Sequence, residues 1–287
     1  MSTKKLLLLL ILTVILGTIS YNYSISKETL YASANLLKVH FIDVGQGDSI
    51  LIQCPDSKNM LIDGGPTDAG SSVENYLKNN RINKIDVIIG THPHADHIGG
   101  LITIVKDFDF KSIYMPKVAN NTACFRDLLV AIKNKGFKIN TPKAGENINF
   151  SSTVTATILA PNDSNYENLN KYSIVIKLSY GHNTFLFEGD AQNISEQEML
   201  EKGYDLKANV LKVGHHGSYN STSPEFLKAV SPKYAVISAG EDNKYGHPHK
   251  ETLKKLHAAG VTVYRTDENG TIIAISNGEK ISIKTEK

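Results

Sequence analysis

The chain has 287 residues, of which 41% are hydrophobic and 21% are charged, a composition typical of a globular domain and not of a disordered segment. Its formal net charge is only +2 at pH 7, and the charged residues before position 35 account for this excess. Any binding of a polyanion must therefore be local, because non-specific nucleic-acid binding depends on many lysine and arginine contacts.

The first residues have the pattern of a targeting segment. Lys4-Lys5 precede an apolar run over residues 6–17, which is the order of regions in a secretory signal. This run is short for a membrane span, which needs roughly 20 residues. An uncleaved anchor stretched through Tyr21 is the alternative. We expect residues 1–34 to be a signal peptide or N-terminal membrane anchor that engages the membrane or the secretion machinery. Residues 35–287 would then form one large domain, secreted or on the extracellular face of the membrane.

Residues 37–63 predict three strands, because short apolar runs alternate there with glycine, proline and aspartate turns. His40 lies inside the first run and is expected to be a packed strand residue. A helix is expected at 71–80, and the apolar run 85–89 predicts a buried strand that Gly90 ends.

Thr91-His92-Pro93-His94-Ala95-Asp96-His97 follows that strand directly. Open α/β sheets bind their ligands at the carboxyl ends of strands. Imidazole and carboxylate are the groups that bind zinc and neighbouring divalent metals. Because alternate residues of an extended loop point the same way, His92 and His94 would share one position and Asp96 and His97 would turn toward a second. This segment therefore predicts one or two Zn²⁺ ions, with Mn²⁺ as the alternative.

The rest of the chain alternates between helical and strand patterns. Helices are expected at 98–106, 126–135, 194–203 and from about 250, and strands at 154–160, 172–180, 184–187, 208–213, 234–238, 261–265, 271–275 and 281–283. Residues 161–170 predict a polar surface loop, and His182 is expected to face solvent in a hairpin turn. Outside the cell Cys54 and Cys124 would be able to pair, or they would remain two separate buried residues.

A second set of polar residues follows two later strands. Glu188-Gly189-Asp190 ends an apolar strand, so a carboxylate again lies at a strand's carboxyl end. Gly214-His215-His216-Gly217 follows the next strand, and its glycines allow the backbone to approach a ligand closely. His247, in Tyr245-Gly246-His247-Pro248, is expected either to face the substrate or to cap the helix near Lys250.

These motifs together resemble the metallo-β-lactamase superfamily. His92, His94, Asp96 and His97 match its HxHxDH signature. The strings at 43–48, 188–190, 215–218 and 245–248 are similar to those of the extracellular hydrolase domain of ComEC-type competence proteins and its free-standing relatives. The similarity runs from about residue 36 to the C-terminus. It implies an α/β fold, the four-layer αββα sandwich.

The resemblance also implies roles for single residues. The metal ligands would be His92, His94, Asp96, His97, Asp190 and His216. Asp190 would bridge two metals, and Asp63 would orient the loop's ligands through hydrogen bonds. His215 would contact the scissile bond, although the assignment between His215 and His216 stays open. Family members usually carry one more histidine, and residues 170–173 stand in its place. The first metal would then lack a ligand, and a single-metal enzyme is the alternative.

The expected function is an exported metal-dependent hydrolase in which metal-activated water attacks the substrate. By analogy with the ComEC-type proteins, the favoured target is a phosphodiester bond of nucleic acid or of a small phosphate ester. DNA would then bind through a local site. Catalytic roles are expected for His215, His247 and Asp96. The alternatives are a lactamase or lactonase that cleaves acyl bonds, and a surface binding module that has lost turnover.

Overall fold

The computed structural model describes residues 35–287, of which residues 37–287 form one compact unit. The expected signal peptide or membrane anchor at 1–34 lies outside the described residues and stays a prediction. Between residues 35 and 287, no helix combines the length and the apolar character that crossing a bilayer requires.

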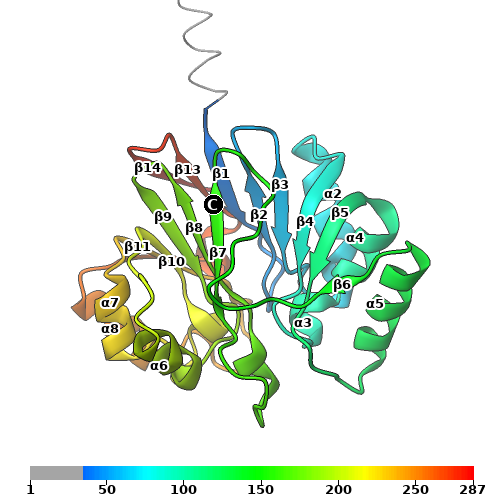
Figure 1. Ribbon diagram of the computed structural model, residues 1–287. Coiled ribbons are helices and arrows are strands. Elements are labelled where there is room, and N and C mark those ends of the chain that lie inside the picture. The colour runs from blue at the N-terminus through cyan, green and yellow to red at the C-terminus, as the bar shows by residue number, and fades with distance from the viewer. Residues whose placement is uncertain (1–34) are drawn as a thin grey trace, which may run out of the picture. The chain divides into compact units, whose positions relative to one another are not determined.

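Two β-sheets form the centre of this unit (Figure 1). The order of the eight-stranded sheet is β14-β13-β1-β2-β3-β4-β5-β6, and that of the six-stranded sheet is β12-β11-β10-β9-β8-β7. The strands are β1 Leu37–Phe41, β2 Ile50–Gln53, β3 Asn59–Ile62, β4 Lys84–Ile89, β5 Asp109–Tyr114, β6 Ile139–Asn140, β7 Thr155–Ala160, β8 Val175–Tyr180, β9 Asn183–Phe187, β10 Val210–Lys212, β11 Tyr234–Ile237, β12 Thr262–Arg265, β13 Ile272–Ser276 and β14 Ile281–Thr285.

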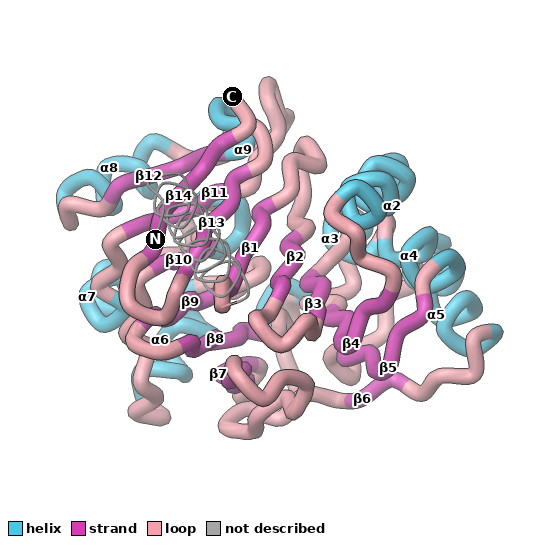
Figure 2. The backbone as a smooth tube through the Cα atoms, turned by 90° about the horizontal axis from the view of Figure 1, so that it is seen from above, coloured by secondary structure: helices cyan, strands magenta, loops and turns pink. Residues whose placement is uncertain are grey.

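Helices lie on the outer faces of both sheets (Figure 2). Helices α2, α4 and α5 cover the eight-stranded sheet, and α6, α7 and α8 cover the six-stranded sheet. The helices are η1 Thr67–Ala69, α2 Gly70–Asn79, α3 Ala95–Ile98, α4 Leu101–Asp107, α5 Ala123–Asn134, η2 Leu169–Tyr172, α6 Asn193–Glu201, η3 Gly214–Gly217, α7 Pro224–Val230, α8 Lys250–Ala258 and α9 Thr266–Asn269.

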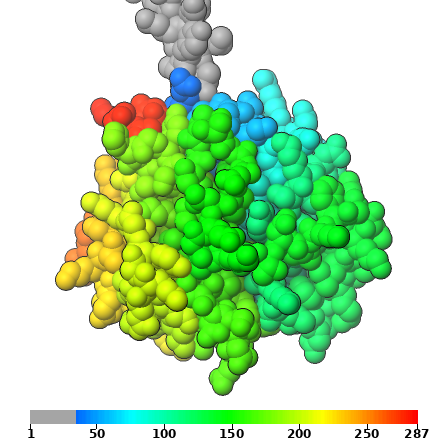
Figure 3. All heavy atoms as spheres, viewed as in Figure 1, coloured from blue at the N-terminus to red at the C-terminus, as the bar shows by residue number. Residues whose placement is uncertain are grey.

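Apolar side chains fill the space between the sheets because alternate residues of each strand face inward. Val39 and Phe41 of β1 belong to this inner core, and the ring of Phe41 lies 6.2 Å from that of Phe187 on β9. Leu51 and Leu61 point the other way and pack beneath the helices. Residues from the middle of the chain, green in Figure 3, run down the centre of the face shown there. This layering confirms the expected αββα sandwich.

Strand direction positions the functional loops. β3, β4 and β5 are parallel to one another, and β9, β10, β11 and β12 are also parallel. The carboxyl ends of parallel strands meet at one edge of a sheet, so the segments that leave them are neighbours.

Two details differ from the sequence-based expectation. The helix expected at 98–106 begins only at Leu101, as α4, and a separate short helix, α3, precedes it; Gly99 and Gly100 lie between the two, where the loop after β3 packs closely. A Cβ at Gly100 would lie 1.9 Å from Gly64 O, so only glycine permits this approach. The strands β5 and β6 and the helices α7 and α9 were not predicted, and α7, at seven residues, is too short for a clear helical period.

Candidate metal centre

Loops from both sheets bring the predicted site residues together. The segment after β4 carries the histidine cluster, and the segments after β9, β10 and β11 carry Asp190, the His215-His216 pair and His247. A cavity of about 280 Å³ lies here, and it is lined by Gln46, His94, Ala95, Asp96, Asn170, Asp190, His215, His216, Tyr245 and His247. His92 and His97 are fully buried behind this lining, and both rings lie close to the Asp190 carboxylate.

Four ligand atoms converge on one position. His97 Nε2 lies 3.8 Å from Asp96 Oδ2 and 3.2 Å from Asp190 Oδ1. His216 Nε2 lies 3.5 Å from Asp96 Oδ2 and 3.3 Å from Asp190 Oδ1. Ligands about 2.1 Å from a tetrahedral zinc ion lie roughly 3.4 Å from one another. These four atoms therefore have the spacing of a tetrahedral metal site.

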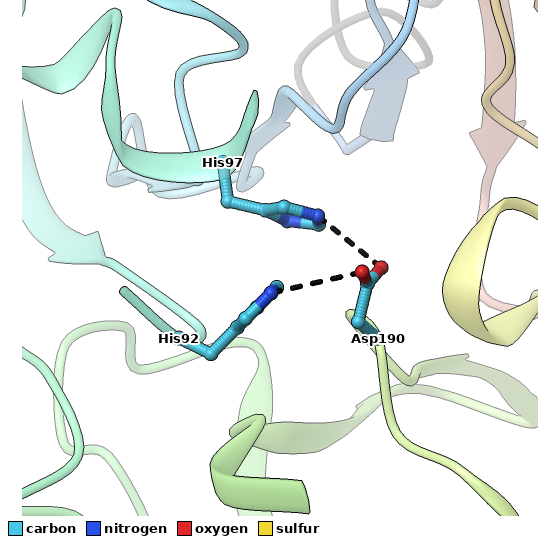
Figure 4. A group of neighbouring side chains, drawn as sticks. All are labelled: His92, His97 and Asp190. Carbon is cyan, nitrogen blue, oxygen red and sulfur yellow. Dashed lines mark ion pairs between the residues drawn. The ribbon is translucent and has the colours of Figure 1, made fainter. Parts of the chain in front are cut away.

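The hydrogen bonding of these atoms fits a cation. His97 Nε2, His216 Nε2 and Asp190 Oδ1 are buried and have no hydrogen-bond partner. Buried polar atoms without partners are costly, and a metal ion shared by all three would satisfy them together. Figure 4 shows His92 and His97 pointing toward the Asp190 carboxylate. The residues present thus fit the divalent metal that this donor set favours.

A second position faces the other oxygen of the same carboxylate. His92 Nε2 lies 3.6 Å from Asp190 Oδ2 and 3.0 Å from His94 Nδ1, and His215 Nε2 lies 3.7 Å from that oxygen. Asn170 lines the cavity here, in the segment 170–173 that the sequence analysis placed where a further histidine was expected, and its Oδ1 is buried without a partner. The two oxygens of Asp190 therefore point to two positions, as a bridging carboxylate requires.

Asp63 orients the loop after β4. Its Oδ2 accepts hydrogen bonds from His97 Nδ1 at 2.8 Å and from Thr91 Oγ1 at 2.7 Å, and its Oδ1 accepts one from the Thr91 amide at 2.8 Å. Because Nδ1 of His97 is engaged in this way, Nε2 is left free to face Asp190. Asp63 itself has φ 58°, a conformation that is uncommon for residues other than glycine.

The charges at this centre favour a cation. Burial by itself would lower the pKa of His97, but the carboxylates of Asp190, Asp63 and Asp96 outweigh this effect and raise its pKa well above the usual range. Burial by itself would raise the pKa of Asp190, but His97 and His216 hold its pKa well below the usual range. The same concentration of carboxylates around His97 attracts a divalent ion.

His215 and His216 point to different places because both adopt a left-handed backbone, with φ 50° and φ 53°. His216 Nδ1 donates to Ser238 O at 3.0 Å, which leaves Nε2 as the free atom among the four converging ligands. His215 Nδ1 donates to Asn220 Oδ1 at 3.1 Å, and its Nε2 accepts from Asn170 Nδ2 at 3.2 Å. The structure thus brings His216 to the four-ligand position and His215 to the Oδ2 side of Asp190.

His247 lies across the cavity from the histidine cluster. Its ring centroid is 5.5 Å from that of His215 and 6.0 Å from that of His216, and its Nδ1 is buried without a partner. Burial, with the nearby positive potential of His216 and His215, lowers the pKa of His247 to about 4. His247 precedes α8, but the N-cap residue of that helix is His249, so helix capping is not the role of His247.

Sequence reasoning missed the partner of Asp48. Asp48, 1% exposed, lies in the segment between β1 and β2, and its Oδ2 is 2.8 Å from Nζ of Lys212, which is 0% exposed on β10. Asp48 Oδ1 also lies 3.5 Å from His216 Nδ1. A lysine inside the apolar strand Val210–Lys212 was the available signal, because a buried lysine requires a counter-charge.

Other candidate residues lie away from the centre. His40 is buried, with Nδ1 2.8 Å from the Tyr76 hydroxyl and Nε2 2.8 Å from Gln53 Oε1, which confirms a packing role. His182 is exposed in the turn between β8 and β9, as expected. Cys54 and Cys124 are both free thiols in the structure.

Comparison with known proteins agrees with this geometry. The family model described as the metallo-beta-lactamase superfamily matches residues 42–241. ComE operon protein 3 of Bacillus subtilis (strain 168) is 33% identical over 252 residues, covering 82% of this chain and 32% of that protein. Competence protein ComA of Neisseria gonorrhoeae is 28% identical over 239 residues, covering 80% of this chain and 31% of that protein. The chain thus spans about a third of the length of these relatives.

A solved structure shows the same fold. The metallo-beta-lactamase fold protein YhfI from Bacillus subtilis superimposes with a TM-score of 0.53 at 14% identity, covering 80% of this chain and 95% of that one. The matched segment, 42–241, includes the cluster after β4, Asp190 and His216. The chain therefore belongs to the metallo-β-lactamase superfamily, with ComEC-type competence proteins among its relatives.

Proposed function

We propose that the chain is an exported hydrolase of phosphodiester bonds. The observation that carries this proposal is the character of the cavity around Asp190. Beside four of the six candidate metal ligands, its polar lining includes groups with N–H or O–H donors, among them Gln46, Asn170, His247 and Tyr245. Such donors suit the negatively charged oxygens of a phosphoryl group more than a neutral amide or ester carbonyl, which develops only one oxyanion.

The metal would be held at two positions. Asp96, His97, His216 and Asp190 Oδ1 would hold it at the four-ligand position, and His92 and His94 would share Asp190 Oδ2 at the other. A divalent metal bound there would supply activated water and polarise the phosphoryl group.

The remaining side chains would orient the substrate. With its pKa lowered to about 4, the His247 ring is neutral at pH 7 and would donate an N–H hydrogen bond to a phosphoryl oxygen. His215, on the Oδ2 side of Asp190, would contact either the phosphoryl oxygen or the leaving oxygen. Gln46 Oε1 accepts a hydrogen bond from the Gly240 amide, which holds the side chain while its Nε2 remains without a partner.

A direct comparison of substrates tests this function. Bound metal would be removed from the purified chain with chelator, and Zn²⁺ or Mn²⁺ would be added back. The chain would then be assayed with bis-p-nitrophenyl phosphate, a chromogenic β-lactam and a lactone. We expect metal to restore cleavage of the diester alone. Faster cleavage of the lactam or lactone would assign acyl hydrolysis instead. Metal binding without turnover of any of the three would support a binding module.

We also propose that the chain is exported, because Lys4 and Lys5 precede the apolar run 6–17, which is the order of regions in a secretory signal. Cell fractionation with mass spectrometry of the N-terminus would test it. A secreted chain that begins near residue 35 would support cleavage, and a membrane-bound chain with an intact N-terminus would support an anchor. A chain confined to the cytosol would refute export without touching the hydrolase proposal.

A further inference from the structure

A second cavity lies at the end of the domain opposite the metal centre. Its volume is about 340 Å³, and its lining includes Asn183, Asn209, Lys233, Tyr234, Glu279 and Lys280. Asn209 and Lys233 directly precede β10 and β11, whereas the segments that form the metal centre leave the carboxyl ends of these strands. In Figure 1 the turn between β13 and β14 lies near the top of the domain and α3, with its metal ligands, lies toward the bottom. This space is termed the lysine cavity.

Hydrogen bonds fix the walls of the lysine cavity. Asn209 Oδ1 accepts a hydrogen bond from the Thr184 amide at 2.8 Å, and Asn209 O accepts one from the Lys233 amide at 3.0 Å. The side-chain amide of Asn183, which is 4% exposed, lies 2.8 Å from Ser276 Oγ. The cavity is therefore preformed, and a ligand bound there would not have to order these segments.

The charges of the lysine cavity favour an anion. Lys233 and Lys280 are exposed, and within residues 35–287 neither of them forms an ion pair. Lys233 Nζ lies 4.9 Å from the centroid of the Tyr234 ring. The acidic lining residue, Glu279, has its Oε1 3.6 Å from Nε2 of the exposed His182. Two ammonium groups without a counter-charge thus border one cavity, and lysine binds phosphate as a point charge.

The chain enters the domain at this same end. Leu37, the first residue of β1, pairs with Ser276 of β13, and Ser276 pairs with Ile281 of β14 beside the cavity. Any segment that precedes Leu37 is therefore joined to the domain here, far from the metal centre. The apolar run 6–17 is short for a membrane span. Weak hydrophobic attachment to a membrane becomes stable when basic side chains of the protein supply a second contact.

We propose that the lysine cavity binds the phosphate of an anionic phospholipid headgroup, so that the metal centre faces away from the bilayer. Lys233 and Lys280 would pair with the phosphate, and the Tyr234 ring would pack against the carbons of the headgroup. This inference draws on the proposed export for the membrane that the chain meets, and it does not depend on the hydrolase reaction.

Co-sedimentation of the full chain with lipid vesicles tests this site. Vesicles of phosphatidylcholine would be compared with vesicles that contain phosphatidylglycerol and phosphatidylcholine in equal parts. We expect Lys233→Gln and Lys280→Gln each to weaken binding to the anionic vesicles by about fivefold, and together by roughly 30-fold. Binding to the neutral vesicles should not change. Residues 1–34 are present in every variant, so their own affinity for lipid is common to all measurements.

Two further variants separate the cavity from general surface charge. Lys117 and Lys250 are exposed lysines at the metal end, after β5 and at the start of α8, and the double change Lys117→Gln/Lys250→Gln is the matched control. It should weaken binding to the anionic vesicles by less than about twofold, because these lysines would face away from the membrane. Glu279→Gln removes the acidic group of the cavity and should tighten binding by about fivefold, a gain that damage to the fold would not produce.

Equal losses in the cavity variant and in the control would show a general attraction between charged surfaces and would overturn the inference. Calorimetric titration with sn-glycerol 3-phosphate distinguishes a soluble ligand from a lipid. Binding of this ester that requires both lysines, together with vesicle binding that requires neither, would assign the cavity to a soluble phosphate ester and overturn the membrane assignment. A chain confined to the cytosol, with lysine-dependent vesicle binding intact, would refute the proposed export alone.

Discussion

The buried ion pair between Lys212 and Asp48 joins the two sheets beside the metal centre. Lys212 belongs to β10 of the six-stranded sheet, and Asp48 lies between two strands of the eight-stranded sheet. Replacing Lys212 by methionine keeps an unbranched side chain but removes its charge. The Asp48 carboxylate, 1% exposed, would then remain buried without a lysine partner.

The expected cost follows from this burial. Removing one partner of a buried ion pair destabilises a protein by about 3–5 kcal/mol. Free energies of unfolding are only about 5–15 kcal/mol, so Lys212→Met would lose a large fraction of the total. For a domain of this size, about 2–4 °C of melting temperature per kcal/mol gives a decrease of roughly 6–20 °C. Because Asp48 also approaches His216, metal affinity should fall by about 10–100-fold, as for other groups that orient a ligand.

Urea denaturation in chelator measures the stability without a contribution from bound metal. Lys177→Met is the matched control, because Lys177 Nζ lies 2.7 Å from Asp205 Oδ2 but the Asp205 side chain is 82% exposed, and it should cost about 1 kcal/mol or less. Adding Asp48→Asn to Lys212→Met removes the unpaired charge and should restore part of the loss. The reasoning is refuted if Lys212→Met matches the control, or if the double variant is no more stable than Lys212→Met.

Three further predictions address the metal centre and the core. Asp190→Ala should reduce diesterase activity more than His247→Ala, because one donor side chain typically contributes about 10²–10⁴-fold while Asp190 faces both metal positions; equal losses at matched metal content would contradict this. Metal should bind to the stripped chain in two unequal calorimetric steps, with the four-ligand position filled first, and Asn170→His should tighten the weaker step; two equal sites would contradict the assignment. Burial lowers the pKa of His40 to about 4, so its stabilising effect is complete above about pH 6.5, and up to about 3 kcal/mol is lost as pH falls from 6.5 to 4. His40→Gln should flatten that pH dependence, and parallel stability profiles would count against the assignment.

Much of the fold and of the site could be predicted from local sequence. The spacing of apolar residues and the positions of turn residues can be recognised within a few residues of sequence. For this reason β4, β9 and α5 were predicted near their observed bounds. His92 and His97 fall within one short loop directly after a strand, so their residue types and the strand's carboxyl end already indicated a metal site.

Only the tertiary structure decided which distant groups meet. Asp48 and Lys212 lie on different sheets, and no local pattern states which carboxylate compensates a buried lysine. The separation of His215 from His216 follows from two left-handed backbone conformations, which the neighbouring glycines permit but do not specify. Tyr219 and Tyr245 come from separate loops, and the rings of His249 and His247 lie between them. Such contacts depend on strand order and on the packing of two sheets, which bring together residues that are far apart in the chain.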